Sequence, residues 1–195
     1  MDKQIKDIYL RALEPEDLDL LYQIENEDEV WNVGSSNVPY SRYTLLNYIA
    51  NASNDIYVDG QVRLIVENVD KQVVGIIDLV NFEPIHQRAE IGFIILDKYR
   101  GQGYGYAAIR KVLEYAKDTL HLWQLYAYVE ISNEASLNCL KTLGFEETAK
   151  LKDWFFHDGK YWNASIMQFF FIKNNPIFWL NEIYSLPLHS QKSKV

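Results

Sequence analysis

Arg100-Gly101-Gln102-Gly103-Tyr104-Gly105 lies between an apolar run, 91–96, and a helical pattern that starts near Tyr104. A strand, a turn with glycines at alternate positions and a helix start form an arrangement that exposes backbone N–H groups to an anion. The three missing side chains let a phosphate approach the main chain, and the helix N-terminus adds partial positive charge. The stretch therefore predicts a phosphate site at a strand–helix junction.

The composition is that of a globular protein. The 195 residues fit one compact domain, and 48% of them are hydrophobic. The net charge of −8 argues against binding to a nucleic-acid backbone, because such binders usually show a basic face. An acidic surface would instead steer a cationic small substrate inward.

Several features bound the compartment and the chemistry. The residues after Met1 are polar and charged, so we expect no signal peptide, and no 18-residue apolar run predicts a membrane span. The single cysteine, Cys139, excludes an intrachain disulfide and suits a reducing cytoplasm. No cysteine–histidine cluster has zinc-ligand spacing, so we expect no metal site.

The acidity is concentrated near the N-terminus. From Ala12 to Ser41 there is no lysine, arginine or histidine, while eight carboxylates crowd the segment 14–29. One interpretation is a solvated helix face that begins after Pro15. The other is a surface that attracts a cation.

Hydrophobic periodicity predicts one α+β (α/β) domain, with a mixed central sheet of about seven strands and helices on both faces, in the order βααβββαβαββ. We place this domain at residues 1–172 and a C-terminal extension with a disordered end at 173–195. The expected strands are 7–13, 62–68, 72–80, 88–96, 122–131, 146–157 and 160–172, and the expected helices are 15–26, 41–52, 104–118 and 133–144.

Two common phosphate sites do not fit the glycine stretch. A P-loop needs Gly-Lys-Ser/Thr, which the chain lacks. A dinucleotide fingerprint needs Gly-x-Gly-x-x-Gly, and its third glycine would fall at Tyr106. A structural turn without a ligand remains an alternative.

The stretch is similar to Arg/Gln-x-x-Gly-x-Gly/Ala, the pyrophosphate-binding signature of the GNAT superfamily of acetyl-CoA-dependent N-acetyltransferases. A second motif follows at the family's usual distance. Asn133-Glu134-Ala135-Ser136, ending in Lys141-Thr142-Leu143-Gly144-Phe145, resembles the family's Asn-x-x-Ser/Ala…Leu-Gly-Phe helix. The resemblance spans roughly residues 7–172 and implies a GNAT-like fold with acetyl-CoA as co-substrate.

The resemblance also implies a cofactor site. Backbone groups of the strand at 91–96 would line the pantetheine arm, amides of the glycine stretch would cradle the pyrophosphate, and the strand at 122–131 would splay away to admit the cofactor. The cofactor-binding residues expected on this basis are Phe93, Ile94, Ile95, Arg100, Gly101, Gln102, Gly103, Tyr104, Gly105, Tyr106 and Asn133.

Two groups within the superfamily resemble the segment Arg88-Ala89-Glu90-Ile91-Gly92-Phe93. They are the spermidine/spermine acetyltransferases and the ribosomal-protein N-terminal alanine acetyltransferases. The segments 86–90 and 155–161 look closer to the polyamine group.

Acetyl transfer to an amine requires that the amine lose a proton, because an alkyl ammonium has a pKa near about 10.4. A carboxylate whose pKa is raised by apolar surroundings could accept this proton. Glu90 is the candidate, since the resemblance puts its counterpart at the acceptor site. The alternative is an ordinary ion pair with Arg88, which would share a strand face with Glu90.

The departing thiolate also needs stabilisation. Members of the polyamine group that this chain resembles have a tyrosine in the second-motif helix. The corresponding residue here is Leu140, which cannot donate a proton. At this position the chain is more similar to the ribosomal-protein group. A free thiol has a pKa near about 8.5, so water can suffice. Ser136 and Tyr104 are candidate helpers, and Ser136 is the one we retain as catalytic.

Three further residues have two interpretations each. Asn133 can bind the pantetheine arm, as the resemblance implies, or cap its helix. Cys139 can be a nucleophile or can pack in the core, which its helical, apolar setting favours. His86 and His157 border the expected acceptor side as loop residues or as bases.

We therefore expect an N-acetyltransferase that transfers acetyl from acetyl-CoA to a primary amine by direct attack. A polyamine such as spermidine is the leading acceptor. The alternatives are the N-terminal α-amine of a ribosomal protein and a non-catalytic acetyl-CoA-binding module. We expect no nucleic-acid or membrane partner, and a homo-oligomer is possible.

Overall fold

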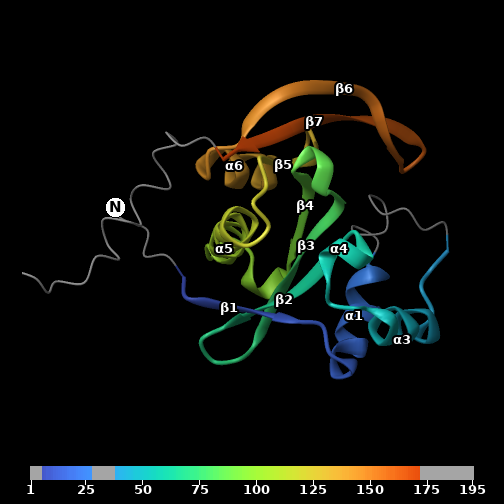
Figure 1. Cartoon of the computed structure of the whole chain (residues 1–195). Coiled ribbons are helices and arrows are strands. Elements are labelled where there is room, and N and C mark those ends of the chain that lie inside the picture. Colours follow the sequence, from blue (N-terminus) through green and yellow to red (C-terminus); the bar gives the residue numbers. More distant parts are fainter. Residues whose placement is uncertain (1–5, 28–37, 172–195) are drawn as a thin grey trace, which may run out of the picture.

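The computed structural model describes residues 6–27 and 38–171. Seven strands within these ranges form one mixed sheet in the order β1-β2-β3-β4-β5-β7-β6 (Figure 1). Neighbouring strands are antiparallel except β4 and β5, which are parallel. The expected sheet is thereby confirmed. Its strands are β1 (Ile8–Ala12), β2 (Val62–Asn68), β3 (Val73–Glu83), β4 (Arg88–Ile95), β5 (Gln124–Glu130), β6 (Glu146–His157) and β7 (Lys160–Phe170).

Helices cover both faces of this sheet. On one face α5 and α6 pack on the larger hydrophobic cluster, and on the other α1 and α3 pack on a smaller one (Figure 1). We call the second face, opposite α5, the α1 face. The helices are α1 (Leu18–Glu25), α3 (Arg42–Asn51), α4 (Ile56–Asp59), α5 (Tyr104–Asp118) and α6 (Glu134–Thr142).

The short helix α4 was not expected from periodicity. It is bounded by local signals: the side chain of Asp55 accepts a hydrogen bond from the amide of Tyr57 (2.9 Å), and Gly60 ends the helix with φ 66°. Both are standard helix-end residues. The expected extension 173–195 lies outside the described residues, and so does residue 172.

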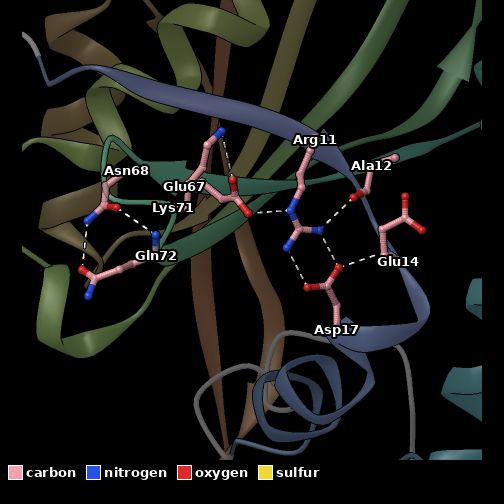
Figure 2. Close-up of polar contacts among 8 residues, drawn as sticks. All are labelled: Arg11, Ala12, Glu14, Asp17, Glu67, Asn68, Lys71 and Gln72. Atoms are coloured by element: carbon pink, nitrogen blue, oxygen red, sulfur yellow. Dashed lines mark hydrogen bonds and ion pairs between the residues drawn. The ribbon is translucent and has the colours of Figure 1, made fainter.

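Arg11 links the sheet to the start of the first helix through hydrogen-bonded ion pairs (Figure 2). From β1 it donates to Asp17, at the start of α1, through two nitrogens (2.6 and 2.8 Å) and to Glu67 on β2 through Nε (2.6 Å). Asp17 is buried, and a buried carboxylate needs such donors to remain charged. Removing one partner would leave the other charge uncompensated.

The acidic segment is therefore more than a solvated helix face. Besides Asp17, Asp19 pairs with Arg42, and Glu25 pairs with Arg63. These arginines come from α3 and β2, so part of the segment's negative charge serves to join elements. Within the described residues, those paired carboxylates contribute less to attracting a free cation than their number in the sequence indicates.

The parallel pair β4–β5 is short. Pairing runs only from Arg88 opposite Gln124 to Glu90 opposite Tyr126, whereas β4 continues to Ile95 and β5 to Glu130. Beyond Glu90 the two strands diverge, as expected from the resemblance. We call this diverging region, 91–95 of β4 and 127–130 of β5, the split.

Candidate active site

The backbone of β4 presents alternate residues to the split. Leu96 donates its amide to Val74 on β3 (3.0 Å), so residues an even number of positions away also face β3. The peptide groups of Phe93 and Ile95 consequently face the split. Ile94 does not join them, because its peptide group faces β3 and its side chain packs in the cluster under α1.

The glycine turn, residues 100–105, lies at the end of the split and leads into α5. Gly101 and Gly103 have φ of 72° and 90°, which glycine adopts without strain. The first capping bond runs from the amide of Ala107 to the carbonyl of Gly103 (3.1 Å). Among the described residues, the amides of 101–106 donate no backbone hydrogen bond. They form a cradle of donors at a helix N-terminus, which suits a phosphate.

Two side chains of this turn hold its shape. Arg100 donates from Nε to the carbonyl of Ile95 (3.0 Å), and its Nη2 lies 3.0 Å from Asp97. Gln102 donates to the carbonyl of Lys98 (2.8 Å). Both side chains therefore brace the turn against β4 and the segment after it, and it is the amides of the turn that the resemblance assigned to the cofactor. A braced turn keeps its amides in place before the anion arrives.

Gly105 lies on the side of α5 that faces β4, where an added Cβ would make ordinary contacts. A Cβ atom there would lie 3.6 Å from side-chain atoms of both Phe93 and Ile95 and 3.9 Å from the sulfur of Cys139. Tyr104 is buried, and its ring contacts Tyr99 edge to face. Its side chain thus belongs to the core, so its expected contribution to the site is its amide.

Helix α6 carries the second motif. Asn133 caps the helix by accepting from the amide of Ser136 (3.0 Å), which leaves its Nδ2 for a second partner. Ser136 is half-buried in the first turn. Leu140 is fully buried in the core, and burial raises the pKa of the Cys139 thiol. A thiol kept protonated is a poor nucleophile, which agrees with packing as the role of Cys139.

Glu90 lies where the split begins, on the α1 face. The alternative ion pair with Arg88 does not form, because Arg88 donates to Glu83 through Nη2 (2.9 and 3.0 Å) and Nε (3.1 Å). The partner of Glu90 is Asn81, whose Nδ2 lies 2.9 Å from Oε2. Burial raises the pKa of the Glu90 carboxyl, and the Asn81 hydrogen bond lowers it in part. The net shift is upward, as a general base requires.

On the α1 face the space beside Glu90, at Gly92, is open, and we call this open space the hollow. Gly92 follows two positions later on the same face, and a Cβ atom added there would meet nothing within 4 Å. Opposite Gly92 on β3 stands Asp78, which Arg63 binds (2.7 Å). Because Arg63 also pairs with Glu25, this group carries one net negative charge beside the hollow.

An aromatic row continues this face along β5. The rings of Tyr126 and Tyr128 are 5.7 Å apart, and Tyr128 stacks on Trp154 of β6 at 5.4 Å. Burial, followed by the nearby charge of Glu90, raises the pKa of Tyr126 to about 12, so it stays a neutral hydroxyl. The sequence carried a signal for these tyrosines, since they alternate with the buried Leu125 and Ala127.

Glu130 ends this row and is bound to the β6–β7 hairpin. His157 places Nε2 2.7 Å from Glu130 and Nδ1 3.1 Å from Asp158, while its ring stacks on Trp162. These contacts raise the pKa of His157, the hydrogen bond to Glu130 most. An imidazole held between two carboxylates connects β5 to the β6–β7 hairpin. His157 therefore fits neither of its two interpretations, as a loop residue or as a base.

The described residues offer no group of histidine, cysteine or carboxylate side chains arranged to hold a metal ion. None of the helices in those same ranges combines the length and the apolar character needed to cross a membrane.

Comparisons with known proteins agree with this geometry. The family model described as acetyltransferase (GNAT) domain matches residues 7–146. The spermidine N(1)-acetyltransferase of Escherichia coli K12 is 31% identical over 163 residues, covering 84% of this chain and 86% of that protein. Spermidine N-acetyltransferase from Vibrio cholerae in complex with CoA and spermine superposes with a TM-score of 0.74 at 27% identity, over 84% of this chain and 95% of that one. A dodecameric structure of the same protein gives 0.72 at 28%, over 84% and 93%.

The chain therefore belongs to the GNAT acetyltransferase family. It is an N-acetyltransferase that uses acetyl-CoA, as expected, and the alternative of a non-catalytic module is set aside.

Proposed function

We propose that this protein acetylates a primary amine of a polyamine such as spermidine, with Glu90 as the general base. The carrying observation is the position of Glu90: a half-buried carboxylate with a raised pKa, beside an open hollow at the point where β4 and β5 separate. The net negative charge of the Asp78–Arg63–Glu25 group favours a polycation there. The spermidine acetyltransferases among the relatives support this acceptor.

The residues fit acetyl-CoA, which supplies the acetyl group as a thioester and leaves as the CoA thiolate. In the proposal, the amides of 101–106 bind its pyrophosphate. The peptide group of Phe93 and the amide of Ile95, whose carbonyl accepts from Arg100, hold its extended arm across the split. Gly105 keeps the approach to β4 clear of a side chain. The side-chain Nδ2 of Asn133, whose Oδ1 caps α6, is available to donate to the same arm.

Glu90 then accepts one proton of the bound ammonium, which frees the nitrogen lone pair for attack on the thioester carbon. The new C–N bond forms as the C–S bond breaks, and the second proton passes from the nitrogen through water to the departing thiolate. The raised pKa of Glu90 narrows its gap to the ammonium, whose pKa is about 10.4. Since Leu140 is buried and apolar, protonation of the thiolate falls to water or to the hydroxyl of Ser136.

One assay tests the acceptor. Acetyl-CoA consumption is measured with spermidine, spermine, aminosugars, a simple monoamine and alanine-starting peptides. We expect turnover with the polyamines and a kcat/KM for them that falls as ionic strength rises, because an acidic site attracts a cation through screened charges. Activity confined to the peptides would reject the polyamine assignment.

Leu140 favours a second acceptor, the N-terminal α-amine of a ribosomal protein, because the resemblance to the polyamine group calls for tyrosine there. An α-amine has a pKa near about 7.7–8.0 and needs less help from a base. The same assay decides, since this acceptor predicts turnover of alanine-starting peptides and none of spermidine.

Two further parts of the proposal concern the molecule's setting. A homo-oligomer is inferred because the Vibrio cholerae relative forms a dodecamer, and light scattering of the purified protein would measure it. A cytoplasmic location follows from the use of acetyl-CoA, a charged metabolite that does not cross membranes freely.

A further inference from the structure

Asn81 is the residue that contacts the Glu90 carboxylate, and an irregularity of the sheet puts it there. The β3–β4 ladder is regular up to Val80 opposite Glu90, then shifts register before Glu83 opposite Arg88. Asn81 lies in this bulge with φ 49°. In a regular strand, the residue after Val80 would point to the opposite face from Glu90. The bulge turns the Asn81 side chain back to the α1 face.

The hydrogen bond fixes one carboxylate oxygen. Asn81 donates from Nδ2 to Oε2 of Glu90 over 2.9 Å. Asparagine tolerates the left-handed backbone of the bulge better than most residues, so the bulge places this donor at a smaller cost in backbone strain. With Oε2 engaged, Oε1 is the oxygen left to accept a proton.

Among the described residues, the charged side chains around Glu90 have other partners. On β4 and the turn before it, Arg88 binds Glu83, and His86 lies 3.9 Å from the same carboxylate. On β3 Asp78 is bound by Arg63, and on β5 the facing group is the neutral hydroxyl of Tyr126. Among the described residues no cation pairs with Glu90.

A neutral donor differs from a cation in this position. A lysine or arginine would favour the carboxylate strongly and make it a weaker base. An amide orients the carboxylate at a smaller cost in basicity, so the effect of burial prevails.

We propose that Asn81 is a positioning residue for catalysis: it holds Oε2 of Glu90 so that Oε1 faces the nitrogen of the acceptor amine. The proposal rests on the proposed role of Glu90 as general base, but the contact itself can be measured without any substrate.

The test uses two variants and a matched control. Asn81→Gly removes the side chain while glycine tolerates the same φ, and Asn81→Asp replaces the donor with a second carboxylate. Asn54→Gly is the control, because Asn54 also has a left-handed backbone (φ 58°) but lies at an exposed turn before α4. The first readout is the pKa of Glu90 from carboxyl ¹³C NMR titration, with the resonance assigned by its loss in Glu90→Gln. The second is the pH dependence of kcat/KM and kcat with the best amine substrate.

We expect Asn81→Gly to raise the pKa of Glu90, to move the acidic limb of kcat/KM to higher pH by the same amount, and to lower the plateau kcat about tenfold. Asn81→Asp should move both further in the same direction, and Asn54→Gly should move neither. A folded Asn81→Gly or Asn81→Asp protein with the pKa of Glu90 and the pH profile unchanged overturns the proposal.

Different results would reject the proposed function and the proposed role of Asn81. If wild-type protein acetylates no amine, the proposed function is wrong, while the NMR titration still decides whether Asn81 binds Glu90. If Glu90→Gln keeps the wild-type pH profile, Glu90 is not the base and the role of Asn81 falls with it.

Discussion

At the scale of single residues, the site depends on what Glu90 lacks as much as on what it contacts. Arg88 lies two positions away on the same strand, which in sequence predicts an ion pair with Glu90. In the fold, the bulge brings Glu83 opposite Arg88, and Glu83 binds the Arg88 guanidinium in place of Glu90. A carboxylate buried without a cation has its pKa raised, and this is the condition for accepting a proton near neutral pH.

Replacing Glu90 by glutamine should lower kcat about a hundredfold near pH 7, because general-base help is lost while the shape is kept. The loss should shrink as pH rises toward the pKa of the ammonium, since the free amine then needs no base. The measurement is kcat against pH with spermidine. Glu146→Gln, an exposed carboxamide change on β6, is the control. A pH-independent loss would remove Glu90 from proton transfer.

The open space at Gly92 leads to a prediction about binding of the acceptor amine. Gly92→Leu should raise the KM for the amine about tenfold or more, because the added side chain occupies the space beside Glu90. KM for acetyl-CoA should change little, and the melting temperature should change little in Gly92→Ala, since a Cβ atom there meets no neighbour. Gly92→Ala should be intermediate. An unchanged amine KM in Gly92→Leu would show that the acceptor binds elsewhere.

At the scale of elements, the β6–β7 hairpin is tied to β5 by the His157–Glu130 contact. The tight turn between the strands has positive φ at Asp158 and Gly159, a conformation that suits a two-residue hairpin. From the hairpin, the exposed Trp154 stacks on Tyr128 of the aromatic row. The contact therefore connects the stability of the hairpin with the shape of the proposed acceptor side.

Stability should depend on pH through His157. Its pKa is raised in the folded state, so the charged form stabilises the fold fully below the unfolded-state pKa of about 6.5, and this contribution is lost as pH rises through the folded-state value. The difference in melting temperature between wild type and His157→Gln should be largest near pH 6 and smaller near pH 9. The exposed His86→Gln is the control. A difference that grows with pH would contradict the ion pair.

Sequence patterns predicted nearly every element but not the contacts between them. Apolar periodicity and end signals such as Gly144, with φ 89°, were sufficient for the helices and strands. The positions of Asn81 and Glu83 were not predictable, because they depend on a bulge whose register arises only when two strands pair. The acidic segment was misleading for a similar reason: its arginine partners come from distant elements.

At the scale of the whole molecule, the split divides the sheet. The β1–β4 half meets the β5–β7 half through three residue pairs and through the helices packed across them. A cofactor arm that bonds to β4 inside the split would connect the halves further.

Binding of CoA should therefore stabilise the protein beyond the glycine turn. At about 100 times its dissociation constant, a ligand adds about 2.7 kcal/mol to the free energy of unfolding. Hydrogen exchange should slow at the amides of 101–106 and also at Phe93 and Ile95, which face the split. Protection limited to the turn would mean that the arm does not lie along β4.

The short β4–β5 ladder has a consequence for evolution and design. Extending the pairing past Glu90 would add hydrogen bonds and bury strand edges, so variants selected for heat resistance alone should tend to close the split. Such variants would gain stability and lose acetyl transfer together. If the cofactor arm lies in the split, as we propose, these separated strand edges are a condition for activity, and a search for more robust forms should leave them apart.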